Sequence, residues 1–186
     1  MRHSQFLRLV AVVVAGVLLG SASAIGAAPG QTAKAHLPRA LEAALRWQAD
    51  AALHGITSSS VSLNGTATGA MWPLDVWMYF FYSSKIKKAF RVLAAGARLE
   101  SAEWPGAVSA SPVTSDFIDS DRAMSILTSN GFKPAGPINI FFGNFCATAP
   151  INRCGPLWYA TDLSTDGKTL FFVDAKTGQF LGKKDR

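Results

Sequence analysis

The stretch that decides the fold lies near the C-terminus and reads "TLFFVDAKTGQFLG", Thr169 to Gly182. An apolar run rich in aromatic residues meets a short polar segment and then a second apolar run, which is typical of two strands joined by a tight turn. In the turn "VDAKTG", we expect the Asp174 carboxylate to accept hydrogen bonds from backbone N–H groups around Thr177, and Gly178 to take a left-handed conformation. The stretch therefore predicts a β-hairpin, and its motif is structural rather than chemical.

The residues before this hairpin predict a helix followed by strands. In "DSDRAMSILTSNGF", Asp119 to Phe132, an Asp/Ser cap precedes an apolar stripe of Ala123, Met124 and Leu127, and Gly131 follows. Three further strands are predicted from "INIFFGNF", "LWYATDL" and "TLFFVD", with Gly-containing turns at "STDG" and "AKTG". The last 65 or so residues therefore predict a helix on an antiparallel meander.

The first half of the chain shows a similar order. A helix is predicted to begin near Pro38 and to end at Gly55, and His54 would then lie at its end. Its apolar stripe would be Leu41, Leu45, Ala49 and Ala52. A short strand is expected at Val61 to Leu63, an aromatic strand over Leu74 to Ser84, and another strand in "AFRVLAAGARLE".

The two halves predict an α+β fold with two tandem helix-plus-sheet units, in which a helix packs on one face of antiparallel sheet. The segment Glu103 to Ser115 is rich in Pro, Ser, Gly and Ala, and is the best candidate for a linker. The predicted divisions are a signal peptide (1–24), a flexible leader (25–36), a degenerate first unit (37–102), a linker (103–117) and a second unit (118–183).

The N-terminus has the pattern of a secretory signal peptide. Arg2 and Arg8 precede the apolar run Leu9 to Leu19, and Ala22 and Ala24 have the spacing of a cleavage site. Eleven helical residues would span roughly 16 Å, well short of a hydrocarbon core of about 30 Å. We therefore expect an exported protein, periplasmic or secreted, that has no membrane span once the signal is removed.

Charge and cysteine usage narrow the class of partner. The formal net charge is +6, and removal of Arg2 and Arg8 leaves 16 basic and 12 acidic residues. This thin basic excess, together with the export signal, argues against nucleic-acid binding.

Cys146 and Cys154 lie close together in a chain expected to meet an oxidising compartment, so a disulfide is expected. Zinc is a poor alternative, because no His/Cys pair stands at ligand spacing.

The segment "FFVDAKTGQFLG" resembles the closing hairpin of a PepSY domain. The likeness extends to the layout of Asp119 to Leu181, and over Pro38 to Leu99 it is faint. It implies an exported module with a helix on an antiparallel sheet, of a kind that occurs beside secreted metallopeptidases and for which peptidase inhibition has been proposed. The tandem layout is also similar to that of a secreted β-lactamase inhibitor.

Motifs of catalysis are not found in the sequence. There is no His-Glu-x-x-His, no Gly-x-Ser-x-Gly and no phosphate loop, so we expect no enzyme, metal or cofactor. We predict a binding module, with an extracytoplasmic protein such as a peptidase as its partner. The candidate contact residues are Trp77, Tyr79, Phe81 and Trp158, if they form a partly exposed sheet face; the alternative is that they belong to the core or to the packing between the two units. Val76, Met78 and Phe80 would then pack against the first helix. A carrier of a small apolar ligand and an enzyme of unrecognised type are the alternatives.

Overall fold

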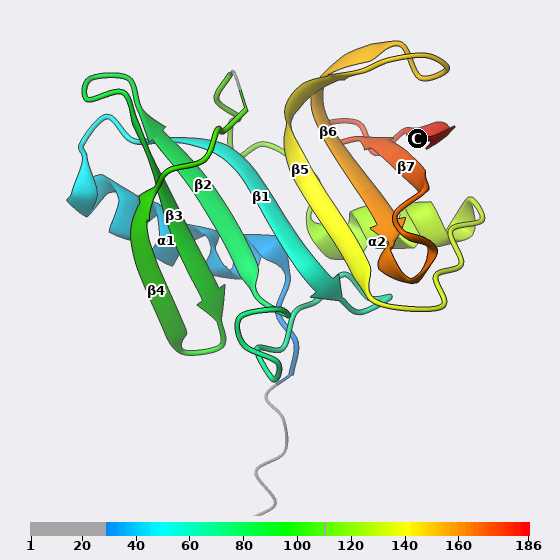
Figure 1. Cartoon of the computed structure of the whole chain (residues 1–186), viewed down its shortest axis with the longest axis horizontal. Helices are drawn as coiled ribbons and strands as arrows, with labels where there is room; N and C mark the ends of the chain where they lie inside the picture. Colours follow the sequence, from blue (N-terminus) through cyan, green and yellow to red (C-terminus); the bar gives the residue numbers. More distant parts are fainter. Residues whose placement is uncertain (1–28, 110) are drawn as a thin grey trace, which may run out of the picture.

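A computed structural model describes residues 29–109 and 111–186. Eight strands form one antiparallel sheet in the order β4-β3-β2-β1-β5-β6-β7-β8, and two helices lie on one of its faces (Figure 1). In chain order the elements are α1 (Ala33–Trp47), β1 (Ala52–Val61), β2 (Trp77–Ser83), β3 (Lys88–Ala95), β4 (Arg98–Trp104), α2 (Ser120–Ser129), β5 (Ile138–Ala147), β6 (Arg153–Asp162), the 3₁₀ turn η1 (Leu163–Thr165), β7 (Thr169–Asp174) and β8 (Phe180–Asp185). The predicted α+β fold, with antiparallel sheet covered by helix on one face, is confirmed.

The second half of the chain folds as its local sequence predicts. The Asp119 side chain caps α2 by accepting a hydrogen bond from the Ser120 N–H, and the helix gives way to Gly131 at φ 90°. Strands β5 to β8 then follow as a meander in which each strand pairs with the next. Capping and turn signals act over a few residues, which is why these boundaries were predictable.

Helix α1 differs from its prediction at both ends. It begins at Ala33, inside the predicted flexible leader, because its first N–H groups bond to the Ser120 Oγ (3.0 Å) and the Asp119 Oδ1 (2.9 Å) at the start of α2. It ends at Trp47, and Gly55 lies within β1 rather than at a helix end. The predicted signal peptide, and the leader up to residue 28, lie outside the described residues.

The buried face of α1 is also different from the predicted stripe. Leu41 and Leu45 are exposed, and the helix instead turns small residues and two larger ones toward the sheet: Ala33, His36, Leu37, Ala40, Ala43 and Ala44. Small side chains allow the helix axis to approach strands that carry large aromatic residues, so the volumes are complementary. A stripe chosen by hydrophobicity alone misses this arrangement.

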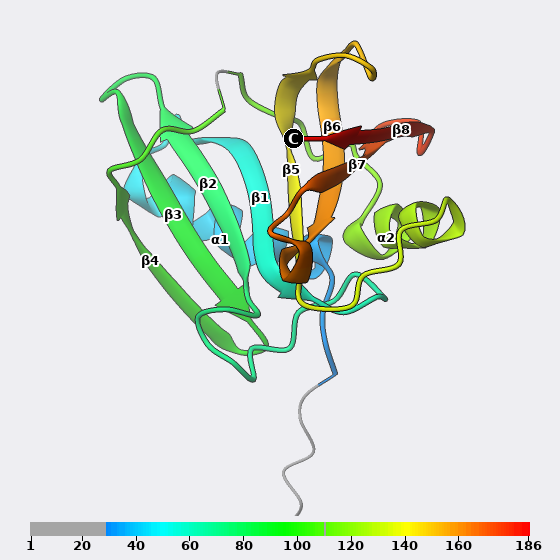
Figure 2. The same cartoon turned by 45° about the vertical axis from the view of Figure 1, so that its right-hand side comes forward.

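A single hydrophobic core joins the two halves of the molecule. The register places one row of buried side chains under the helices, running across six strands: Val92, Tyr79, Ile56, Phe142, Trp158 and Val173. The central pair in this row is Ile56 on β1 and Phe142 on β5. Both helices therefore cover the same face of one continuous sheet, and Figure 2 shows how that sheet twists across its width.

The predicted linker, 103–117, is part of this packing. Its first residues complete β4, and Phe117 near its end is buried against Phe142, with ring centroids 4.2 Å apart. The composition of the segment, rich in small residues, Ser and Pro, correctly predicts irregular structure. The segment is nevertheless packed against the sheet and is not a free spacer.

Candidate functional site

The face of the sheet opposite the helices is the candidate functional site. We call it the open face, and its central side chains are Met78, Phe80, Phe141, Phe145 and Tyr159. Because side chains alternate along a strand, these residues point away from the helices, although all but Phe145 lie between core residues in the sequence. All five are partly exposed.

A cluster of aromatic rings occupies the second half of the open face. The Phe141 and Tyr159 rings stack with centroids 5.3 Å apart, and Phe145 meets Tyr159 edge-on at 5.7 Å. Phe172 on β7 extends the cluster at 5.9 Å from Tyr159. Burial raises the pKa of the Tyr159 hydroxyl, although the nearby Arg186 charge acts in the opposite direction.

Two facing glycines let this cluster lie flat on the sheet. Gly55 on β1 pairs with Gly143 on β5, at the centre of the molecule. A Cβ added at Gly143 would lie only 2.7 Å from the nearest ring atom of Phe141, and one at Gly55 would lie 3.4 Å from the same ring. The ring of Phe141 therefore packs directly on the backbone of the two glycines, where any larger residue would place its Cβ against the ring.

The first half of the open face combines aromatic rings with arginine. Phe80 and Trp104 lie with ring centroids 5.5 Å apart, and the Arg91 guanidinium carbon is 4.9 Å from the Trp104 ring. Arg98 lies 4.0 Å from the ring of Trp72 in the connection before β2. These cation–π contacts hold positive charge against an apolar surface.

Residues 105–109, the crossing segment, pass over one end of the open face. The His54 Nδ1 lies 2.6 Å from the Ser109 carbonyl oxygen, and the Ser109 hydroxyl donates to the Asn144 carbonyl oxygen. A hollow of about 300 Å³ beneath the segment is lined mainly by Phe80, Trp104, Val108 and Phe141. A wider hollow of about 660 Å³ beside it has Phe145 and Tyr159 among its lining residues.

The predicted contact residues do not lie on this surface. Trp77, Tyr79, Phe81 and Trp158 are all fully buried beneath the helices, so the prediction that they form an exposed face is wrong. Three of them are further held by hydrogen bonds, since the Tyr79 hydroxyl donates to the Ala33 carbonyl oxygen, the Trp77 indole to that of Gln31 and the Trp158 indole to that of Ile118. Burial, and to a lesser degree the Asp119 charge, raises the pKa of Tyr79 well above its usual value.

The alternation predicted for the aromatic strand is correct, but its two faces are exchanged. Val76, Met78 and Phe80 lie on the open side and not against α1. The sequence argument missed Phe141, Phe145 and Trp104 altogether. The signal that could have found Phe141 and Phe145 is the segment "FFGNF", where these two aromatic residues lie on either side of Gly143 and therefore point to the same face of the strand.

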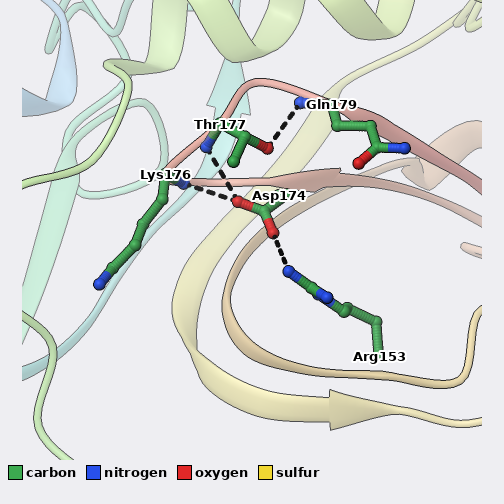
Figure 3. A network of polar contacts seen from close by, with 5 residues as sticks. All are labelled: Arg153, Asp174, Lys176, Thr177 and Gln179. Atoms are coloured by element: carbon green, nitrogen blue, oxygen red, sulfur yellow. Dashed lines mark hydrogen bonds and ion pairs between the residues drawn. The ribbon is translucent and has the colours of Figure 1, made fainter.

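The turn motif and the disulfide are confirmed in place. The Asp174 Oδ1 accepts hydrogen bonds from the N–H groups of Lys176 (3.0 Å) and Thr177 (2.9 Å), while its Oδ2 binds Arg153 at 2.9 Å (Figure 3). Gly178 takes φ 74°. Cys146 and Cys154 are bonded directly across β5 and β6, below the tip of that hairpin.

The titratable side chains that could take part in chemistry are found in structural positions in the described residues. Within 29–109 and 111–186, no group of three His, Cys, Asp or Glu residues is placed to bind a metal ion. His54 belongs to β1 and contacts the crossing segment, and His36 is buried in α1. Asp162 accepts hydrogen bonds from the hydroxyl and N–H of Ser164 and from the N–H of Ala135 before β5, and these bonds lower its pKa.

Comparison with known proteins finds no family model, no curated protein and no solved structure that matches this chain. The resemblance of the closing hairpin to a PepSY domain therefore stays a prediction. In the part of the chain that the structure describes, no helix has the length and apolar character needed to cross a membrane.

Proposed function

We propose that this chain is an exported, non-enzymatic binding module whose open face binds an extracytoplasmic protein, with a secreted peptidase as the first class of partner to test. The observation that carries the proposal is the row of partly exposed aromatic side chains on the open face, Phe80, Trp104, Phe141, Phe145 and Tyr159. An aromatic surface on a rigid sheet suits protein binding, because little side-chain entropy is lost on contact.

Several contacts support two tandem units within the single sheet. Each helix is followed by four strands, and the second strand of each set carries a buried Trp. The Trp77 indole donates to the Gln31 carbonyl oxygen and the Trp158 indole to that of Ile118, in each case two residues before a helix begins. We therefore propose that the halves are copies of one helix-plus-four-strand unit, the second of them PepSY-like.

Export is supported by the Cys146–Cys154 disulfide, because such bonds persist in oxidising compartments. The intact mass of the exported protein tests this directly. Processing near Ile25 is expected, and a chain that retains Arg2 would contradict it.

A carrier of a small apolar ligand is the second candidate, favoured by the two hollows on the open face. The space between helices and sheet, the other place for such a pocket, is filled by Trp77, Tyr79 and Trp158. Both hollows open to solvent along the sheet, which suits a partner's side chains better than an enclosed ligand.

The test is affinity capture from the organism's own envelope fraction, with peptidase activity of that fraction measured in parallel. We expect the unaltered protein to retain a partner that Phe141→Ala/Tyr159→Ala loses. Leu41→Ala, on the outer surface of α1, is the control and should retain it. If the double variant stays folded in urea melts and retains the same proteins as the unaltered chain, the open face is not the interface.

A further inference from the structure

Charged side chains are unevenly divided between the two faces of the sheet. Because side chains alternate along paired strands, the register shows which of them share the open face with Phe80 and Tyr159. Arg186, just after β8, is placed there because it lines the same hollow as Tyr159. The open face thus carries five basic and two acidic residues: Arg91, Arg98, Arg153, Lys184 and Arg186, with Glu100 and Asp174.

Most of the net charge of the described chain therefore lies on this one face. Without Arg2 and Arg8, the chain has 16 basic and 12 acidic residues, a net charge of +4. The open face holds five of the basic and two of the acidic residues, and so +3 of that charge. The remaining 11 basic and 10 acidic residues nearly cancel. The basic excess that looks thin along the sequence is concentrated by the fold.

The two acidic residues of the open face are already neutralised by arginine. Glu100 lies 2.6 Å from the Arg98 guanidinium, and Asp174 lies 2.9 Å from that of Arg153 (Figure 3). Among the described residues, the other three cations of the face, Arg91, Lys184 and Arg186, form no ion pair. Three positive charges are thus left for a partner.

Two of these cations border a third hollow on the open face, over β5 to β8. It has a volume of about 370 Å³, and its apolar lining is Phe145, Tyr159, Leu170 and Phe172. Lys184 and Arg186 complete the lining. Asp185 also borders the hollow, but alternation turns its side chain away from that of Lys184, and its carboxylate accepts a hydrogen bond from the Thr169 hydroxyl (2.6 Å).

We propose that the partner of the open face presents an acidic surface, on which carboxylates flank apolar side chains. The apolar side chains enter the hollow beside Tyr159, and the carboxylates meet Lys184 and Arg186 at one end of the aromatic row and Arg91 at the other. Complementary charge of this kind speeds association and selects against basic partners. The inference rests on the function proposed above and names the chemistry of the protein that is bound.

The number and spacing of the cations favour a protein over other polyanions. A nucleic acid or an anionic membrane is held by many basic residues close together. Here Arg91 on β3 is separated from Lys184 on β8 by five strands, and aromatic rings occupy the space between them. Single carboxylates set among apolar side chains match this surface, and a continuous row of phosphates does not.

Two synthetic peptides test the charge preference without a known partner. One alternates Leu with Glu, and the other has Gln in place of each Glu. Binding is followed by fluorescence polarisation of the labelled peptides. At low ionic strength the acidic peptide should bind about tenfold or more tightly than the neutral one. The difference should shrink in high salt, because exposed charge pairs are screened.

Arg91→Gln/Lys184→Gln/Arg186→Gln should remove most of this preference and leave binding of the neutral peptide little changed. Charge reversal guards against misfolding as an explanation. Arg91→Glu/Lys184→Glu/Arg186→Glu should prefer a peptide that alternates Leu with Lys, which a misfolded protein would not do.

The matched control, Arg46→Gln/Arg122→Gln/Lys133→Gln, removes the same charge from exposed positions on the helical side and should keep the preference. The proposal is overturned if the acidic and neutral peptides bind equally or not at all, or if both neutralised variants lose the preference to the same extent. Tighter binding of single-stranded DNA, or of phosphatidylglycerol vesicles, than of the acidic peptide would also overturn it.

Capture from the envelope fraction separates this failure from failure of the proposed function. If Phe141→Ala/Tyr159→Ala loses the captured protein while the neutralised variant of the open face retains it, the open face is an interface whose partner is not acidic. If Phe141→Ala/Tyr159→Ala retains the captured protein, the open face is not the interface, and both proposals fail.

Discussion

At the level of the single residue, His36 is a titratable side chain buried in the core. It is 1% exposed, and its Nε2 has no hydrogen-bond partner among the described residues. Burial, with the Arg39 charge as a smaller cause, lowers its pKa below the usual value of about 6.5. Since the unfolded chain then binds a proton more readily, the free energy of unfolding should fall as the pH drops below about 6.5.

His36→Leu should flatten this dependence, because Leu fills a similar volume without titrating. Urea melts over a series of pH values between neutral and mildly acidic measure the effect. If both proteins lose stability in parallel as the pH falls, His36 is not the group responsible.

Asp174 also makes the fold less stable in acid, but at a lower pH than His36 and through a carboxylate whose charged form the fold stabilises. Its burial alone would raise the pKa, but the N–H of Thr177, the Arg153 guanidinium and the N–H of Lys176 outweigh burial and hold the pKa below its usual value. Asp174→Asn should cost about 1–3 kcal/mol of stability at neutral pH, because a charged partner of Arg153 is lost. The stabilisation by the carboxylate is present above about pH 4 and is lost as the pH falls through the lowered pKa.

The measurement is the difference in unfolding free energy between the two proteins, followed from neutral to acidic pH. The difference should shrink in acid. Asp116→Asn, at an exposed position, is the control and should change little at any pH. A difference for Asp174→Asn that is the same at every pH would show that the turn does not depend on the carboxylate charge.

At the level of the element, the two faces of β2 should respond unequally to truncation. Trp77→Ala or Tyr79→Ala should cost about 3–5 kcal/mol, because each removes a fully buried ring and a hydrogen bond to the backbone before or at the start of α1. Phe80→Ala should cost clearly less, since its ring is partly exposed on the open face. Urea midpoints of the three variants decide the matter, and equal losses would mean that the open face is covered.

At the level of the whole molecule, the shared core predicts one cooperative unfolding transition. The β1–β5 pairing and the contacts of Asp119 and Ser120 with the start of α1 tie the two halves together. Met124→Ala, in the core under α2, should therefore destabilise β2 as well as β7, by about 2–5 kcal/mol. Hydrogen exchange of the most protected amides in both strands reports this, and protection lost in β5 to β8 alone would indicate separate domains.

The sequence by itself determined the features that depend on neighbouring residues. The Asp174 turn, the Asp119 cap of α2, Gly131 and the meander of β5 to β8 all follow from side chain to backbone contacts over a few positions. Alternation along β2 was likewise readable, because it is a property of any strand. Export and disulfide pairing were predicted from patterns of the same local kind.

Only the tertiary structure decided which surface of the protein is free. Both faces of β2 are apolar, so nothing local distinguishes Tyr79 from Phe80. Tyr79 is buried because α1 lies over it, and α1 begins at Ala33 because Ser120, far along the chain, caps it there. The open face exists because β1 pairs with β5 and brings both helices to one side. Contacts between residues distant in sequence set that choice, and no short stretch of the chain encodes them.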